Sequence, residues 1–212
     1  MNLPVIILGG GGHAKVLIEA LLLQRREVLG YTDPYEALGM VLGLSRLGDD
    51  QAILKYDPEK LKLVNGVGSI AFTSSRRRLY ELFRRKGYRF QNVAHPSAII
   101  ASDVLLEEGV QIMAGAVVQP GSRLGANTII NTGVVVEHDC DIGAHVHIAP
   151  GAVLSGNVRI EEGVLVGAGA VIIQGVAIGD RSIIGAGTVV LKDVPSCVTV
   201  VGAPGKVIRH HV

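Results

Sequence analysis

Side chains that can move protons are concentrated in one short stretch of the chain. Three of the seven histidines lie between residues 131 and 147, and the first of them is followed directly by an aspartate. The cluster consists of Asn131, Glu137, His138, Asp139, Cys140, His145 and His147. The remaining histidines are His13, His95, His210 and His211. This concentration predicts a reaction site, although a single exposed histidine such as His145 is often an inert surface residue.

A histidine beside an aspartate suits general base catalysis. Imidazole has a reference pKa of about 6.5, and base catalysis typically contributes about 10²–10⁴ in rate. An adjacent carboxylate can fix the imidazole tautomer and stabilise the imidazolium. Acyl transfer to an amine needs such a base, because an ammonium has no lone pair with which to attack a thioester. The pair His138 and Asp139 therefore makes acyl transfer a candidate reaction.

A second candidate site lies near the start of the chain. Gly9, Gly10, Gly11 and Gly12 separate an apolar run from a helical pattern, and Asp33 ends the next expected strand. Glycine amides at a helix N-terminus can approach a phosphate closely, and the spacing is similar to a dinucleotide fingerprint. Such a motif alone is of low specificity, so glycines that serve only the fold are an alternative. Nothing further along the chain supports a dehydrogenase.

The element that carries the histidine cluster is predicted by a six-residue repeat. An aliphatic residue occupies every sixth position from Ile100 to Val190 without a gap. Three short strands of this kind close a triangular coil of about 18 residues, and coils stack about 4.8 Å apart with the aliphatic side chains inside. A second inward position, two residues before each aliphatic, is small or β-branched. Cys140 lies at such a position, so we expect it to pack in the core rather than act as a nucleophile.

The first ninety residues follow a different pattern. Apolar strands are expected at 5–10, 27–33 and 61–68, and helices at 13–26 and 74–88. Strands that alternate with helices predict an α/β domain with a parallel sheet. We place the boundary before His95, which gives domains of residues 1–94 and 95–212.

Composition argues against several classes of partner. The chain has 20 basic and 19 acidic residues, so its net charge of +1 creates no electrostatic field that would attract nucleic acid or an anionic membrane. Its apolar segments are interrupted well before the roughly 18 residues needed to span a membrane, and the N-terminal segment lacks the features of a signal peptide. The two cysteines suit a reducing cytoplasm, where we expect the protein.

Three segments of the chain together resemble one branch of the hexapeptide acyltransferases. They are GGGGHAKV, INTGVVVEHDCDIGAHVHIAPGAVLSGNV and VVGAPGKVIR. The branch comprises bacterial nucleotide-sugar N-acetyltransferases of the bacillosamine and perosamine pathways and related sialic acid O-acetyltransferases. The resemblance covers nearly the whole chain. It implies a small Rossmann-like domain followed by a left-handed parallel β-helix, a homotrimer, and acetyl-CoA bound in the groove between neighbouring β-helices.

The same resemblance implies roles for individual residues. His138 matches the general base, Asp139 its acidic partner and Asn131 a polar residue of the same pocket. The nucleotide-sugar pocket matches Gly10, Gly11, His13, Asp33 and Gly68, with His13 near the reacting amine. The acetyl-CoA site matches His147 near the thioester and Gly156, Ala168 and Ala186 along the pantetheine groove, with a backbone amide near Gly156 as a candidate oxyanion donor. The implied reaction is direct transfer of acetyl from acetyl-CoA to the 4-amine of a UDP-, dTDP- or GDP-linked 4-amino-4,6-dideoxy sugar, without a metal.

One departure and two alternatives follow from this resemblance. Relatives often have a Gly-Asn or Gly-Asp pair and then an arginine after the third strand, whereas here Gly68 is followed by Ser69 and later by Arg76. The nucleotide base is therefore not predicted. The alternatives are O-acetylation of a sialic acid or similar sugar and a zinc hydratase of the γ-carbonic anhydrase type. The second needs a histidine ligand from an earlier coil, and the sequence has none between Pro96 and Glu137.

Overall fold

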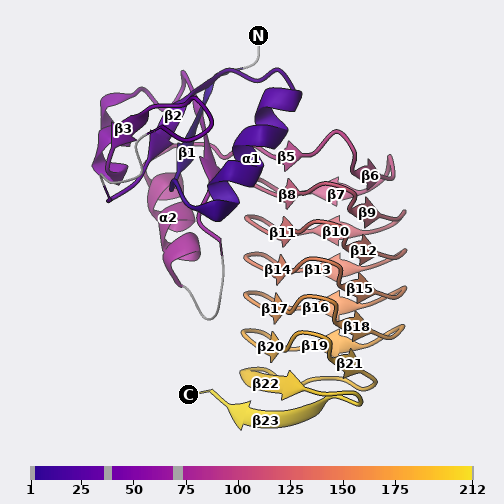
Figure 1. Ribbon diagram of the computed structural model, residues 1–212. Coiled ribbons are helices and arrows are strands. Elements are labelled where there is room, and N and C mark those ends of the chain that lie inside the picture. The colour runs from indigo at the N-terminus through magenta and orange to yellow at the C-terminus, as the bar shows by residue number, and fades with distance from the viewer. Residues whose placement is uncertain (1–2, 36–39, 69–73, 212) are drawn as a thin grey trace. The chain divides into compact units, whose positions relative to one another are not determined.

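The computed structural model describes residues 3–35, 40–68 and 74–211 and divides into two compact units (Figure 1). Unit 1 is Met1–Pro96 and unit 2 is Ser97–Val212. From the sequence, the boundary was predicted between residues 94 and 95. That these two parts are separate domains stays a prediction. Ser69, which marks the departure from the pattern of relatives, lies outside the described residues.

Unit 1 contains a four-stranded parallel sheet in the order β3-β2-β1-β4. The strands are β1 (Val5–Leu8), β2 (Val28–Thr32), β3 (Arg46–Gly48) and β4 (Lys62–Asn65), and β5 (Val93–Ala94) follows later. All four side chains of β1 are fully buried, as the unbroken apolar run predicts for an inner parallel strand. The expected α/β architecture is confirmed. Strand β3 was not predicted, because it is a short, half-buried edge strand without an apolar run.

Within the described residues of unit 1, two α-helices and one 3₁₀ helix accompany this sheet. They are α1 (Gly12–Leu23), η2 (Asp50–Lys55) and α2 (Ser74–Arg85). Helix α1 buries Ala14, Leu17, Ile18 and Leu21, which recur at helical spacing. Helix η2 was not predicted from the sequence, and Asp49 caps it by accepting from the Gln51 amide at 3.0 Å. Within the described ranges, no helix is both long and apolar enough to cross a membrane.

Unit 2 is a parallel β-helix with three faces (Figure 1). Face 1 consists of β6 (Ile99–Ile100), β9 (Val117–Val118), β12 (Val135–Val136), β15 (Val153–Leu154), β18 (Val171–Ile172) and β21 (Val189–Val190). Face 2 consists of β7 (Leu105–Leu106), β10 (Arg123–Leu124), β13 (Asp141–Ile142), β16 (Arg159–Ile160) and β19 (Ala177–Ile178). Face 3 includes β8 (Gln111–Ile112), β11 (Ile129–Ile130), β14 (His147–Ile148), β17 (Leu165–Val166), β20 (Ile183–Ile184), β22 (Val198–Val201) and the antiparallel β23 (Lys206–His210).

The interior of the β-helix follows the six-residue repeat. Each strand pairs with the strand one coil further on, so that Ile142 lies beside Ile160 and Val136 beside Leu154. These four side chains are at most 2% exposed. The predicted register is therefore confirmed. Because every coil ends its strands at the same three corners, residues 18 positions apart are neighbours along a corner.

Candidate active site

His138 and Asp139 lie in the corner between β12 and β13, and their side chains contact each other. His138 Nδ1 lies 2.9 Å from Asp139 Oδ2. With Nδ1–H donating to the carboxylate, Nε2 carries the lone pair and is the nitrogen able to accept a proton. Both side chains are more than half exposed, at 54% and 67%, so a substrate can reach them. The geometry is that of an oriented imidazole base.

The imidazole ring of His138 lies directly against Gly156, the residue one coil further along the same corner. A Cβ placed on Gly156 would come within 2.6 Å of both Cε1 and Nε2 of the ring. Real Cβ atoms essentially never approach so closely. The absence of a side chain at Gly156 therefore creates the space that the ring occupies.

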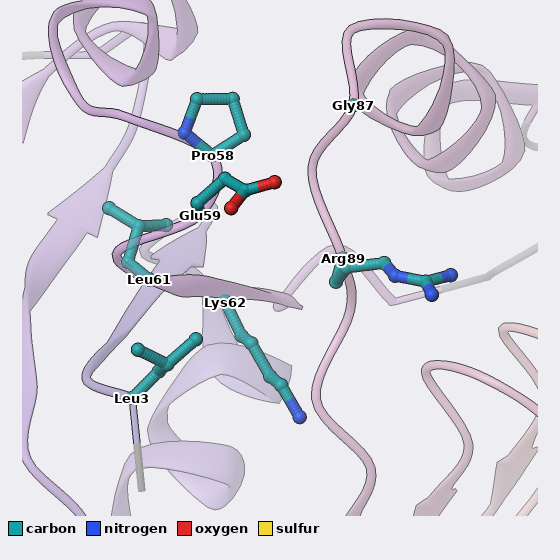
Figure 2. Close-up of a pocket in the computed structure, with 7 residues that line it drawn as sticks. All are labelled: Leu3, Pro58, Glu59, Leu61, Lys62, Gly87 and Arg89. Carbon is teal, nitrogen blue, oxygen red and sulfur yellow. The ribbon is translucent and has the colours of Figure 1, made fainter. Parts of the chain in front are cut away.

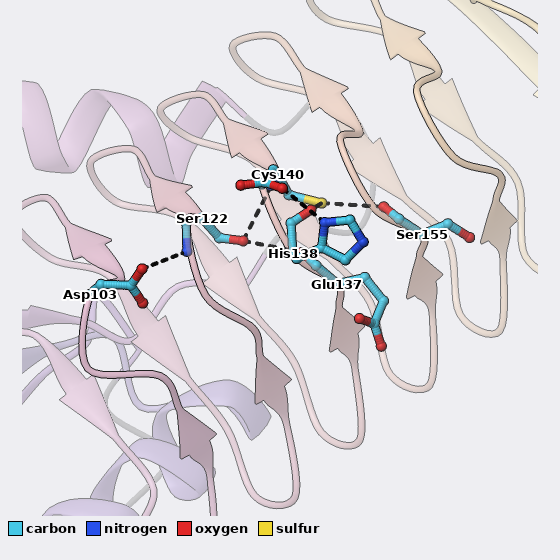
Figure 3. Close-up of polar contacts among 8 residues, drawn as sticks. Asp103, Ser122, Glu137, His138, Cys140 and Ser155 are labelled. Atoms are coloured by element: carbon cyan, nitrogen blue, oxygen red, sulfur yellow. Dashed lines mark hydrogen bonds and ion pairs between the residues drawn. The ribbon is translucent and has the colours of Figure 1, made fainter.

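Cys140 follows the pair in the same corner and points into the core (Figure 3). Its Sγ lies 3.3 Å from the carbonyl oxygen of Ser155, and its amide donates to Ser122 Oγ at 3.2 Å. Burial raises the pKa of the Cys140 thiol to about 11. The thiol is therefore protonated near neutral pH and is a poor nucleophile, as its inward position in the repeat predicts.

Glu137 directly precedes His138 in the same corner, whereas the three remaining polar residues of the cluster lie elsewhere around the coil. Asn131 follows β11 and its Nδ2 lies 3.1 Å from Nε2 of His147, the first residue of β14. His147 is 8% exposed. His145 occupies the corner between β13 and β14, with Nδ1 at 2.9 Å from Asn127 Nδ2. The sequence cluster thus divides into three parts: residues 137–140 at one corner, Asn131 with His147, and His145 with Asn127.

Ala168 and Ala186, which the resemblance assigns to the pantetheine groove, lie at the corner that joins face 3 to face 1. Both are exposed, and they occupy equivalent positions in successive coils. The amide of Gly187 donates to the Ala168 carbonyl at 2.8 Å and so joins the two successive coils at this corner. Gly156, which is predicted to line the same groove, lies at the His138 corner instead. Within one chain, Gly156 and the two alanines therefore lie at opposite ends of face 1.

The glycine loop of unit 1 is held by Asp33. The Gly10 amide donates to Asp33 Oδ2 at 2.8 Å, and the Tyr35 amide donates to Oδ1 at 2.9 Å. Helix α1 begins after Gly11 without a side-chain cap or an acidic residue in its first turn. No atom lies within 4 Å of a Cβ placed on Gly11 or Gly12. The N-terminus of α1 therefore has no side-chain cap and is open beside Gly11 and Gly12, which suits an anion such as a phosphate.

Gly68 and His13 lie together beside this loop. A Cβ placed on Gly68 would be 3.4 Å from the Cβ of His13. The chain before Gly68 is fixed by Arg76, whose Nη1 donates to the carbonyls of Asn65 at 2.7 Å and Val67 at 2.8 Å. Burial lowers the pKa of Arg76 to about 9, so its guanidinium remains charged near neutral pH. From the sequence, Arg76 was noted only because it lies further along the chain than the arginine of relatives. Its contacts with the backbone before Gly68 were not predicted.

A shallow pocket of about 180 Å³ lies at the end of the sheet where β1 and β4 begin (Figure 2). It is lined by Leu3, Pro58, Glu59, Leu61, Lys62, Gly87 and Arg89. Lys62 pairs with Val5 at the beginning of β4 and β1, whereas the glycine loop follows the end of β1. The pocket contains none of the predicted site residues and is separate from the glycine loop.

No set of three His, Cys, Asp or Glu side chains suited to a metal ion is found in the described part of the chain. The expectation that the reaction needs no metal stays a prediction.

Comparison with known proteins matches both units to families. Residues 4–83 match the PglD N-terminal domain, and segments 103–137, 121–156 and 157–192 match the bacterial transferase hexapeptide repeats. The chain is 40% identical to perosamine N-acetyltransferase from Caulobacter crescentus, with 97% of each chain covered and a TM-score of 0.90. The chain belongs to the PglD-type nucleotide-sugar N-acetyltransferases. It is therefore an acetyltransferase that uses acetyl-CoA.

Two further solved structures resemble this PglD-type enzyme over their whole length. The acetyltransferase domain of PglB from Neisseria gonorrhoeae, in complex with acetyl coenzyme A, is 34% identical, with 98% of this chain and all of that chain covered and a TM-score of 0.92. WeeI from Acinetobacter baumannii is 25% identical, with the same coverage and a TM-score of 0.81. The perosamine N-acetyltransferase was solved with CoA and GDP-perosamine, in variants that include a substituted histidine. A search of curated protein sequences found no significant match.

Proposed function

We propose that this enzyme transfers the acetyl group of acetyl-CoA to the 4-amine of a nucleotide-linked 4-amino-4,6-dideoxy sugar, for bacterial glycan or O-antigen synthesis. The observation that carries the mechanism is the exposed His138 ring, which is oriented through Nδ1 by Asp139 and supported by Gly156. A GDP-linked sugar is the first substrate to test, because the relative solved with GDP-perosamine is 40% identical to this chain.

The proposed mechanism is direct transfer with His138 as the general base. The amine nitrogen attacks the thioester carbonyl carbon while His138 Nε2 accepts the proton that the amine loses. The carbon–sulfur bond then breaks and CoA leaves. Asp139 accepts from Nδ1–H at 2.9 Å and stabilises the imidazolium that forms. Cys140 takes no part, because its thiol is buried and protonated.

Two anchoring sites complete the proposal. The uncapped N-terminus of α1, with His13 and Gly68 beside it, would hold the diphosphate of the nucleotide sugar. Asp33 would act by holding the loop through the Gly10 amide. Acetyl-CoA would lie along the small exposed residues Ala168 and Ala186. Asn131 and His147 would line the pocket near the thioester.

We also propose that the enzyme is a homotrimer in which acetyl-CoA binds between neighbouring β-helices. The outward residues of face 1 are all aliphatic, whereas charged residues dominate the outward positions of face 2. The face 1 residues are Ile99, Val117, Val135, Val153, Val171 and Val189. Such a column favours burial against another subunit. Sedimentation analysis should give a trimer, and the double substitution Val135→Arg and Val153→Arg should give monomers; a wild-type monomer would contradict the assembly.

The reaction is tested by thiol release from acetyl-CoA, measured with Ellman's reagent. The substrates are GDP-, UDP- and dTDP-linked 4-amino-4,6-dideoxy sugars, with free sialic acid and bicarbonate hydration as comparisons. Rapid turnover with one amino sugar supports the proposal and identifies the nucleotide. Turnover of sialic acid alone favours O-acetylation, and hydration of bicarbonate with bound zinc favours the hydratase. The cytoplasmic location stays a prediction.

The base assignment is tested by His138→Asn. Loss of a general base should lower kcat at least about 100-fold while the melting temperature and oligomeric state stay as in the wild type. His145→Asn is the matched control, because His145 lies at a different corner of the same coil. Wild-type turnover in His138→Asn would refute the assignment.

A further inference from the structure

The His138 corner contains a column of residues 18 positions apart that reaches back toward the first coil (Figure 3). Asp139 lies one coil after Gly121, and Gly121 lies one coil after Asp103. The Gly121 amide donates to Asp103 Oδ2 at 3.0 Å. In the next two coils, the equivalent amides of Asp139 and Asn157 donate to backbone carbonyls of the preceding coil instead. A side chain of the first coil, Asp103, thus fixes the backbone one coil before the proposed catalytic pair.

The carboxylate of Asp139 lies over the Cα of Gly121. A Cβ placed on Gly121 would overlap Asp139 Oδ1 and would lie 3.4 Å from its Cγ. The other oxygen of the same carboxylate, Oδ2, contacts His138 Nδ1 at 2.9 Å. The carboxylate therefore fits between the glycine and the imidazole.

The backbone conformation alone does not require glycine at this position. Gly121 has φ +74°, in the left-handed region, but Asp139 and Asn157 adopt φ +60° and +57° at equivalent positions of the same corner. Aspartate and asparagine tolerate this region well. What distinguishes position 121 is the carboxylate that occupies the space of a side chain.

We infer that Gly121 is a positioning residue for the acetyl transfer: its missing side chain makes room for the Asp139 carboxylate that orients His138, and Asp103 holds Gly121 in place. This inference rests on the proposed roles of His138 and Asp139. A side chain at position 121 would push aside the end of a flexible, exposed carboxylate, so the fold should tolerate it while the orientation of the base is lost.

The experiment measures kcat, both KM values and the melting temperature of Gly121→Ala. We expect kcat to fall at least about tenfold, with both KM values within about twofold of the wild type, because only the base is disturbed. Gly115→Ala is the matched control: Gly115 has φ +66°, and a Cβ placed on it would have no atom within 4 Å. It carries the same backbone strain without displacing a carboxylate, so its kcat should match the wild type. Gly121→Asn provides a second variant that suits the left-handed backbone.

A double-mutant cycle with Asp139→Gly decides the mechanism. If Gly121 acts through the carboxylate, Gly121→Ala causes no further loss of kcat once that carboxylate is absent. An equal loss in both backgrounds, or an equal loss in Gly115→Ala, would overturn the inference in favour of general strain. If Gly121→Ala and Gly121→Asn are fully active while Asp139→Gly is impaired, the inference about Gly121 is overturned and the proposed role of Asp139 still holds. Full activity of both His138→Asn and Asp139→Gly overturns the proposed roles as well.

Discussion

Replacement of Gly156 by alanine should displace the His138 ring without unfolding the β-helix. The new Cβ would lie 2.6 Å from Cε1 and Nε2 and 3.2 Å from Cδ2, whereas ordinary contacts begin at 3.4 Å. The ring must therefore retreat by about 0.8 Å. A misplacement of about 1 Å at a reacting centre can cost about 100-fold in rate, which corresponds to about 2.7 kcal/mol of transition-state stabilisation.

The fold should tolerate this substitution. Gly156 does not have a positive φ, so alanine fits its backbone, and the His138 side chain is 54% exposed and free to swing outward. We expect a loss of less than about 1 kcal/mol in unfolding free energy, which corresponds to a fall in Tm of at most roughly 2–4 °C. The assay is thiol release with the preferred nucleotide sugar, analysed as kcat and separate KM values.

Two outcomes would count against this reasoning. Wild-type kcat would show that the ring position does not limit the reaction. A loss confined to the KM of acetyl-CoA would show that Gly156 acts through the pantetheine groove, the role that the family resemblance implies. In a His138→Asn background, Gly156→Ala should cause no further loss of kcat.

Two other substitutions test the remaining parts of the site. Gly11→Val should raise the KM for the nucleotide sugar more than the KM for acetyl-CoA, because its side chain would enter the open space in front of the α1 amides; equal effects on both KM values would contradict the division of binding between the units. Cys140→Ala should keep kcat within about twofold, and native Cys140 should resist iodoacetamide, detected by mass spectrometry. Burial raises the pKa of this thiol from 9.0 to about 11, so its contribution to stability is complete below about pH 9 and is lost as pH rises toward 11. Rapid labelling of the folded protein at pH 8 would refute its burial.

The repeat of unit 2 could be predicted in full, because its physical cause is one-dimensional. Inward positions recur every six residues, so the buried column that contains Ile142 and Ile160 is visible as a spacing. The parallel sheet of unit 1 could be predicted for the same reason, since β1 is an unbroken apolar run before a helical pattern. The short edge strand β3 could not, because it has neither an apolar run nor an alternation.

The sequence also determined the chemical types at the site, a histidine beside a carboxylate and bare glycines before a helix, since these are local properties. Only the tertiary structure decided which residues surround them. Closure of each coil carries His138 and His147 to different places on the triangle and brings Gly121 and Gly156 against the catalytic pair. These contacts join residues about one coil apart, so they depend on the corner geometry and on where each side chain points. Neither can be read from spacing alone.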